Sequence, residues 1–301
     1  MIIRPRPSFL QLFFVMRGSV VPRIAPLLAG FTLYAIGVVL FARAVHLDLG
    51  PYGILPFTLL GVTLSIFLGF RTNAAYDRWW EARKLWGQLV FEIRNLTRAA
   101  FALLPADRQQ ARLMLRESLA FCHYLRGQLR GVDAEPEASP FLEGEHPVAG
   151  SHNRPDAVLR RMGERIGALK AGGAIDSMDY RILDERLSSL AALHAGCERI
   201  ANTPLPFAYT LLLMRSAYLF CLLLPFGLVG PLGWATPVFT LVIAYTLFGP
   251  DALAAELEDP FGTEANDLPL DRMCRICEIA VFEALGEPAP APMTAVDYYS
   301  S

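Results

Sequence analysis

The residues whose spacing most clearly indicates a function lie in one uncharged run that is long enough for a helix. Leu49–Phe70 contains Val62, Ile66 and Phe70 at positions i, i+4 and i+8, which places them on one face of a helix. Such a stripe either packs against a neighbouring helix or, repeated in a ring of copies, lines a narrow hydrophobic passage. Periodicity alone favours packing, because apolar stripes are common on membrane helices.

Cysteine and histidine pairs offer only a weak case for a metal centre. Cys274 and Cys277 have the spacing of half a zinc site, and His194 and Cys197 repeat that spacing on another predicted helix. Two positions one helical turn apart on a half-buried face explain each pair better. The sequence contains no Ser/His/Asp set, phosphate-binding loop or dinucleotide fingerprint. We therefore expect no metal site and no enzyme.

Carboxylates gather in one short segment near the end of the chain. Clustered carboxylates are the ligands that Ca²⁺ prefers, but their spacing here differs from that of an EF-hand loop. A solvated turn that caps a helix is the interpretation we favour. The residues are Glu256, Glu258, Asp259, Glu264, Asp267 and Asp271.

The composition indicates a membrane protein. Of the 301 residues, 53% are hydrophobic and 19% are charged, whereas soluble domains contain about 25% charged residues. A net charge of -2 without a basic run argues against binding to nucleic acid. Long uncharged stretches predict an all-α fold with four membrane spans, at about residues 24–44, 50–70, 204–228 and 232–250.

Charged residues are nearly absent from these spans. Apart from Arg43 at the far end of the first span, the exception is Arg215, and its place close to the cytoplasmic end of the third span favours a structural role over a place in an ion pathway. Haem proteins need buried histidines and ion-coupled carriers usually need buried carboxylates, and the spans contain neither. A passive pathway needs no such group, because a hydrophobic constriction gates ions by dewetting.

Basic residues flank the spans on one side only. Arg4, Arg6, Arg17 and Arg23 precede the first span, whereas the connection 46–53 contains no Lys or Arg. Four more basic residues follow the second span. Because cytoplasmic loops are enriched in Lys and Arg, we expect a multi-pass protein of the inner membrane with both chain ends in the cytoplasm.

The rest of the chain is expected to form a helical bundle in the cytosol. Amphipathic patterns predict helices within 71–130, 156–200 and 268–285. Residues 131–155 are expected to be a solvated acidic loop, and residues 286–301 a disordered tail. Because these helices interrupt the spans in sequence, we expect a single domain over residues 1–285.

Two motifs resemble the bestrophin family, in its bacterial branch. The first is RTNAAYDRWWEARKLWG, from Arg71 to Gly87, directly after the second span. The second is DPFGTEANDLPLD, from Asp259 to Asp271, which looks like the segment after the last membrane helix of that family. Both motifs are long, and the four-span layout fits, so the resemblance covers residues 1–285.

This resemblance implies a homopentameric ion channel with a narrow neck lined by the second membrane helix. The neck positions of the family match Val62, Ile66 and Phe70. Because of this match, we now favour pore lining over packing as the role of the stripe. A second, cytosolic constriction is expected at Ile182. In the acidic belt that binds Ca²⁺ in eukaryotic members, only Glu264 and Asp267 keep carboxylates here. This weakens the case for calcium, and we expect no required cofactor.

We therefore predict a pentamer in the lipid bilayer that conducts small monovalent ions passively through a hydrophobic gate. Bacterial relatives resemble cation channels, and an acidic cytosolic surface attracts cations, so Na⁺ and K⁺ are expected to pass. The first alternative is a chloride channel of the same architecture. The second is a membrane-anchored interaction or signalling protein whose cytosolic bundle binds a partner.

Overall fold

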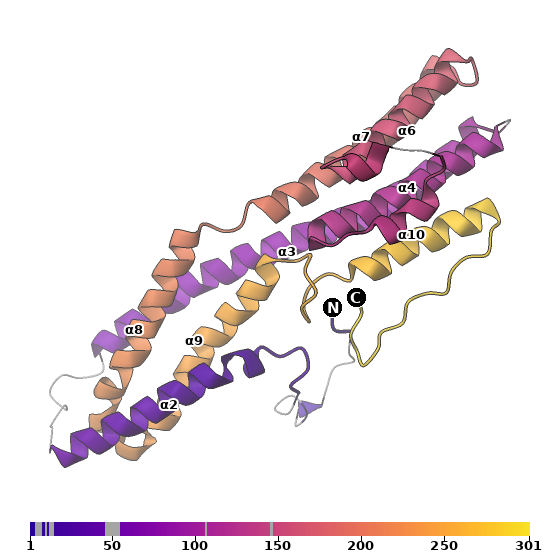
Figure 1. The fold of residues 1–301 in the computed structure, drawn as a ribbon. Coiled ribbons are helices and arrows are strands. Elements are labelled where there is room, and N and C mark those ends of the chain that lie inside the picture. Colours follow the sequence, from indigo (N-terminus) through magenta and orange to yellow (C-terminus); the bar gives the residue numbers. More distant parts are fainter. Residues whose placement is uncertain (4–7, 10, 12–14, 46–54, 106, 145–146) are drawn as a thin grey trace. The chain divides into compact units, whose positions relative to one another are not determined.

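The computed structural model describes the chain except for residues 4–7, 10, 12–14, 46–54, 106 and 145–146. The described residues form helices joined by turns, together with two isolated β-bridges near the chain ends (Figure 1). The predicted all-α fold class is therefore confirmed.

The described chain divides into two compact units, whereas the sequence indicated a single domain over residues 1–285. The span unit comprises Pro5–Trp79 and Pro204–Asp259. The charged unit comprises Met1–Arg4, Trp80–Thr203 and Pro260–Ser301. The division follows composition: the long uncharged stretches fall in the first unit, and most ion pairs of the described residues fall in the second.

The span unit is built from α2 (Val21–Ala44), the first half of α3 (Leu55–Leu103), α8 (Phe207–Leu232), η4 (Gly233–Ala235) and α9 (Thr236–Glu258). Helix α2 packs against both α8 and α9 (Figure 1). The rings of Phe31 and Phe248 stack with their centroids 5.6 Å apart. Around them lies a core of Ile24, Leu28, Leu64, Phe220, Cys221, Leu224, Leu228, Ala244, Leu247 and Ala252.

Three helical stretches of the described chain are long and apolar enough to cross a membrane, and the last contains both α8 and α9. Each of the four predicted spans thus corresponds to a helix, although residues 50–54 of the second span lie outside the described residues. Helix α9 continues to Glu258, beyond the predicted end at residue 250. The number of membrane crossings itself stays a prediction.

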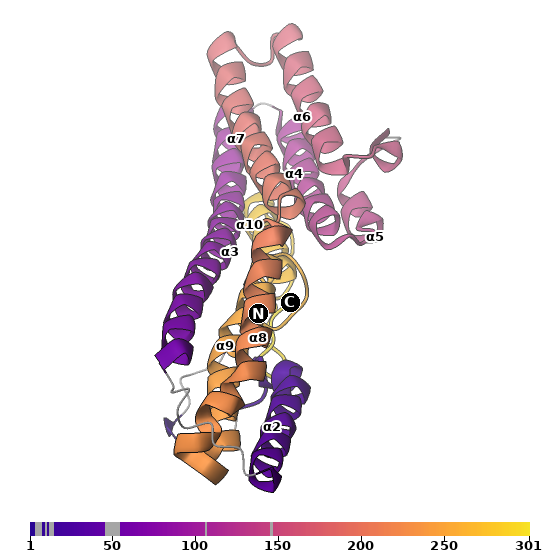
Figure 2. The ribbon, with the colours of Figure 1, turned by 90° about the vertical axis from the view of Figure 1, so that its left-hand side faces the viewer.

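The charged unit is built around α4 (Arg108–Arg130), which packs against α6 (Arg154–Ala171), α7 (Ser177–Asn202) and α10 (Leu270–Leu285). Figure 2 shows α6 and α7 running side by side next to α4. The core-facing side of α4 is fully buried at Met114, Leu115, Leu119, Phe121 and Leu125. These helices match the predicted segments within a few residues at each end.

Local capping residues fix where these helices begin and end. The Asp107 side chain accepts a hydrogen bond from the backbone N–H of Gln110 at 3.1 Å, which satisfies one of the free donors at the start of α4. Asp176 and Asp179 form a reciprocal capping box at the start of α7. Helix α4 ends at Gly131, whose φ of 64° suits glycine best.

Two segments expected to lack structure are ordered in part. In the acidic loop 131–155 the structure has a short helix α5 (Glu135–Ala138) and two 3₁₀ turns, η2 (Ser139–Phe141) and η3 (Pro147–Gly150). Its Asp133 accepts a hydrogen bond from Arg154 at 2.6 Å. Cations from outside the loop also hold it: Arg126 of α4 lies 3.5 Å from Glu137, and Arg161 of α6 donates to the carbonyl of Glu143 at 2.6 Å. The composition of the loop alone does not show these partners.

The tail 286–301, expected to be disordered, returns to the beginning of the chain. The backbone N–H of Ile3 bonds to the carbonyl of Tyr298 at 2.8 Å, and that of Ser300 to the carbonyl of Met1 at 2.9 Å. The Tyr299 hydroxyl donates to the carbonyl of Thr263 at 2.8 Å. Pairing between the two chain ends is invisible to a local sequence pattern, because the partners are almost 300 residues apart.

Candidate functional site

The three residues of the predicted neck are exposed on one face of α3. The exposed fraction is 56% for Val62, 54% for Ile66 and 60% for Phe70, which is high for such large apolar side chains. Their spacing of four residues keeps them on one side of the helix. No other helix of the described span unit covers this face.

The opposite face of α3 holds the helix in the span unit. Leu64, Arg71 and Ala75 are buried there. Close packing on α8 also needs glycine: a Cβ on Gly227 would lie 2.4 Å from the Phe57 ring, so only glycine lets that ring approach. The helix therefore turns its buried side towards the rest of the span unit and the predicted neck residues away from it.

An open hollow of about 580 Å³ adjoins the neck face in the span unit. Val62 and Ile66 form part of its rim, and Gly61 and Ser65 leave room on the α3 side. Phe220 and Leu224 of α8 form part of the opposite wall. Because its lining is mainly apolar, the hollow suits an apolar side chain of another helix or a lipid tail better than a charged ligand.

Immediately after Phe70, a buried cluster of charged groups ties α3 to α9. Arg71 is only 3% exposed and forms an ion pair with Asp251. A second carboxylate, that of Glu258, lies 3.7 Å from Arg71. Buried charges are tolerated when they are paired in this way, and breaking such a pair is costly.

Glu258 extends this cluster to the beginning of α8. Its Oε1 accepts a hydrogen bond from the backbone N–H of Leu205 at 3.1 Å. Its carbonyl accepts a second one from Nε of Arg78 at 2.6 Å. Three helices of the span unit are thus linked next to the neck, which fixes the rotation of α3 about its own axis.

Ile182, the predicted cytosolic constriction, lies in the second turn of α7 in the charged unit. Its side chain is half-buried, beside the fully buried Leu183. Its role as a constriction stays a prediction.

Glu264 and Asp267, the candidate cation ligands, lie in the turn between α9 and α10. Asp267 is 2% exposed, and its Oδ2 accepts a hydrogen bond from the backbone N–H of Glu264 at 2.7 Å. The Glu264 side chain points into solvent. Asp267 therefore stabilises the turn itself. Within the described ranges, no group of three or more His, Cys, Asp or Glu residues is placed to hold a metal ion.

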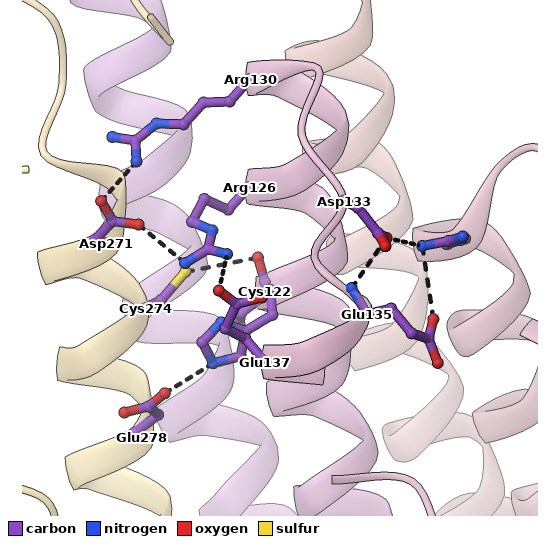
Figure 3. A network of polar contacts seen from close by, with 11 residues as sticks. Cys122, Arg126, Arg130, Asp133, Glu135, Glu137, Asp271, Cys274 and Glu278 are labelled. Atoms are coloured by element: carbon purple, nitrogen blue, oxygen red, sulfur yellow. Dashed lines mark hydrogen bonds and ion pairs between the residues drawn. The ribbon is translucent and has the colours of Figure 1, made fainter. Parts of the chain in front are cut away.

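The Cys274–Cys277 pair faces α4, as Figure 3 shows for Cys274 and Cys122. The Cys274 thiol donates to the carbonyl of Cys122 at 3.6 Å. A hydrogen bond with Cys277 and burial raise the pKa of the Cys122 thiol, and burial also raises the pKa of Cys274. These thiols stay protonated near neutral pH and pack between α4 and α10.

The second pair behaves in the same way. His194 contacts the amide oxygen of Gln128 at 3.1 Å and the Glu198 carboxylate at 3.2 Å, and burial lowers its pKa. Burial raises the pKa of Cys197 to about 12. His194 and Cys197 are both buried within the charged unit.

A comparison with known families gives a match over nearly the whole chain. The family model described as the bacterial and fungal bestrophin protein matches residues 1–283. The chain belongs to the bestrophin family. This bestrophin is 61% identical to a protein of Mesorhizobium japonicum named a voltage-dependent anion channel-forming protein, covering all of this chain and 97% of that one. A protein of the same name from Escherichia coli is 43% identical, covering 94% of this chain and 93% of its own.

Solved structures give the same family. The crystal structure of a bacterial bestrophin homologue from Klebsiella pneumoniae, phased with zinc, superposes with a TM-score of 0.82 at 39% sequence identity. The match covers 87% of this chain and 98% of that one. The comparisons confirm the resemblance inferred from the two motifs, the membrane character of this bestrophin, and the expectation of a channel protein rather than an enzyme.

Sequence reasoning missed the buried cluster of Arg71, Asp251 and Glu258. A usable signal was present: Arg71 directly follows one uncharged run, and Asp251 directly follows another. Opposite charges at the same end of two apolar helices are expected to meet when those helices pack together. Arg215, by contrast, was noticed and is exposed on α8.

Proposed function

We propose that this bestrophin is a passive ion channel in which copies of α3 form the wall of the pore. The observation that carries the proposal is the bare face of Val62, Ile66 and Phe70 on a helix long enough to cross a membrane. On a membrane helix an exposed apolar face is covered either by lipid or by copies of the same helix, and the match of these three positions to the neck of the family favours the copies. In a ring of copies they make a hydrophobic constriction that stops ions when it dewets.

The ring is proposed to be a closed homopentamer in the inner membrane, with both chain ends in the cytoplasm. One chain with four spans is too small to enclose a water-filled pore and bury its own contacts. Cyclic symmetry solves this, because every copy contributes the same helix. The family membership supports the pentamer, and the basic residues around the first two spans support the orientation.

For the permeant ion, the comparisons favour the alternative over the main expectation. The sequence predicts a channel for Na⁺ and K⁺, with chloride as the alternative. The Mesorhizobium and Escherichia relatives are both named anion channel-forming proteins, and the former is 61% identical. We therefore propose that this bestrophin conducts small monovalent anions. The apolar neck has no fixed charge, so selectivity has to come from the size of the ring, from the cost of dehydrating the ion and from the electrostatic potential outside the neck.

The remaining site residues keep secondary roles in this proposal. Ile182 is proposed to form a second constriction where the pathway leaves the charged unit. Glu264 and Asp267 are proposed to act mainly in the structure of their turn, and calcium is not required for conduction.

Two measurements on the purified protein test the proposal. Native mass spectrometry of the detergent-solubilised protein gives the number of copies. Reversal potentials in a planar bilayer under a KCl gradient give the permeant ion. We expect five copies and a reversal potential near the Nernst potential of chloride.

Each outcome has a distinct meaning. A monomer or dimer without current contradicts the pore and supports an anchored interaction protein. A pentamer whose reversal potential lies near the Nernst potential of K⁺ keeps the channel and overturns the proposed anion selectivity. A pentamer with no current contradicts passive conduction.

A further inference from the structure

The second half of α3, from Trp80 to Leu103, lies in the charged unit. Its carboxylates form ion pairs with one neighbouring helix. Glu81 forms an ion pair with Arg199 of α7. The buried Glu92 lies 3.5 Å from Arg186 of α7. Both acidic groups of this half of the helix are thus matched by arginines of a neighbouring helix.

The cations of this half of α3 have no such partners. Among the described residues, no ion pair involves Arg83, Lys84, Arg94 or Arg98. Lys84, Arg94 and Arg98 are exposed. By contrast, Arg126 and Arg130 of α4 and Arg161 and Arg165 of α6 all bind carboxylates.

Two of these cations border a hollow of about 380 Å³ between α3 and α10. Arg94, Asn95 and Arg98 lie on its α3 side, and Ala280 is its contribution from α10. One guanidinium nitrogen of Arg98 donates to the side chain of Asn95, an uncharged acceptor. The lining contains two full positive charges and no carboxylate. A hollow of this kind suits a small hydrated anion.

Lys84 and Arg98 lie a whole number of helical turns after the predicted neck residues. Helix α3 is uninterrupted from Leu55 to Leu103, and an α-helix has about 3.6 residues per turn. Lys84 follows Ile66 by 18 positions, which is about five full turns. Arg98 follows Val62 by 36 positions, about ten full turns. Both cations therefore share the helix face that presents the neck.

We propose that Lys84, Arg94 and Arg98 form an anion-collecting surface that supplies the selectivity of this channel. The proposal rests on the proposed anion-conducting pore. In a pentamer the surface is repeated five times around the pathway, and its positive potential raises the local concentration of small inorganic anions and lowers that of cations. The ligand class is a hydrated monovalent anion such as chloride.

The contribution of these residues to ion selectivity depends on the salt concentration, and this distinguishes an anion-collecting role from a purely structural one. Electrostatic attraction by exposed charges acts over about 10 Å at 0.1 M salt and about 3 Å at 1 M. The contribution of these residues is therefore large in dilute KCl and small in concentrated KCl. Packing contacts have no such dependence.

The test compares full-length protein with the double variant Arg94→Gln/Arg98→Gln in planar bilayers, at low and at high KCl. The control is Arg160→Gln, which removes a similarly exposed cation from α6. We expect the double variant to lose about threefold or more of its chloride over K⁺ permeability ratio in dilute salt, and much less in concentrated salt. The Arg160→Gln control stays at the wild-type ratio.

A second variant, Arg94→Glu/Arg98→Glu, reverses the charge and is expected to move the reversal potential towards that of K⁺. Native mass spectrometry checks that each variant keeps the wild-type number of copies. An anion-selective wild type whose variants keep its permeability ratio at both salt concentrations overturns the anion-collecting surface and leaves the proposed function intact. A wild type that selects K⁺ overturns this surface together with the proposed anion selectivity, and a wild type that carries no current overturns passive conduction as well.

Discussion

The span unit and the charged unit differ in which side chains they bury and which they expose. The span unit buries one small cluster, Arg71 with Asp251 and Glu258, and exposes large apolar side chains such as Val62 and Phe70. The charged unit buries its apolar residues around α4 and joins its helices by ion pairs. The difference shows which environment each unit is built for: a low-dielectric surrounding for the first and water for the second.

Both units nevertheless contain one carboxylate–arginine cluster at a junction of helices. In the charged unit the Glu117 carboxylate, almost fully buried, accepts hydrogen bonds from Arg161 at 2.6 Å and from Arg165 at 2.6 and 3.0 Å. In the span unit the buried partner is the cation Arg71. The comparison predicts that removing the buried member costs most in either unit.

The largest effect is expected for Arg71→Gln in the span unit. Two carboxylates, those of Asp251 and Glu258, lose their counter-charge in a mostly buried place, which should lower the free energy of unfolding by about 4 kcal/mol. Denaturation in detergent measures this loss. Arg215→Gln is the matched control, because that arginine is exposed on α8 and its loss should cost little. Equal losses in the two variants would contradict the special role of the buried cluster.

A similar but smaller effect is expected for Glu117→Gln in the charged unit. Arg161 and Arg165 lose their shared carboxylate but keep partial access to water, so the expected loss is about 3 kcal/mol. Arg160→Gln on the same helix α6 removes only an exposed ion pair with Asp156 at 3.7 Å and should change stability by less than about 1 kcal/mol. If Glu117→Gln costs no more than this control, the charged unit does not depend on its buried carboxylate.

Packing in the span unit is tested by Gly227→Ala. The added methyl group would lie 2.4 Å from the ring of Phe57, so helix α8 or that ring must move, at a cost of about 2 kcal/mol. Gly30→Ala on α2 meets nothing within 4 Å and should be neutral or stabilising. Thermal unfolding of the two variants gives the comparison, and a stable Gly227→Ala protein would show that α3 and α8 pack less closely there.

Alkaline pH should weaken the charged unit through its buried thiols. The folded state raises the pKa of Cys122 and Cys274, so above about pH 9 the unfolded chain releases protons that the folded chain keeps. Stability is therefore complete below this pH and falls as pH rises, by about 1 kcal/mol for each thiol between pH 9 and 10. Unfolding at both pH values, repeated with Cys122→Ala/Cys274→Ala, measures it. An unchanged loss in the double variant would point to other groups.

Much of the fold was predictable because it follows from local patterns. Uncharged runs of membrane length gave the helices of the span unit, and amphipathic periodicity with residues such as Asp107 and Gly131 gave those of the charged unit. Helical periodicity also placed Val62, Ile66 and Phe70 on one face. The family motifs, rather than this periodicity, decided between pore lining and packing.

The features that escaped prediction join residues far apart in the chain. The Arg71–Asp251 pair spans 180 positions, and Tyr298 and Ile3 lie at opposite ends of the sequence. Acidic composition suggested a solvated loop over residues 131–155, yet Arg154 binds Asp133 within it. Cation selectivity was expected from the likeness to bacterial relatives and from an acidic cytosolic surface, whereas no ion pair of the described residues involves Arg94 or Arg98 of α3.

The central claim is that the bare face of α3 is the wall of an ion pathway, and one pair of variants tests it most directly. Ile66→Ala shortens a neck residue, whereas Phe67→Ala shortens the next residue, which is 46% exposed but turned by about 100° around the helix. Single-channel recording in planar bilayers should show a clearly raised conductance or open probability for Ile66→Ala and wild-type behaviour for Phe67→Ala. Equal effects of the two variants, or no effect of Ile66→Ala, would contradict the claim.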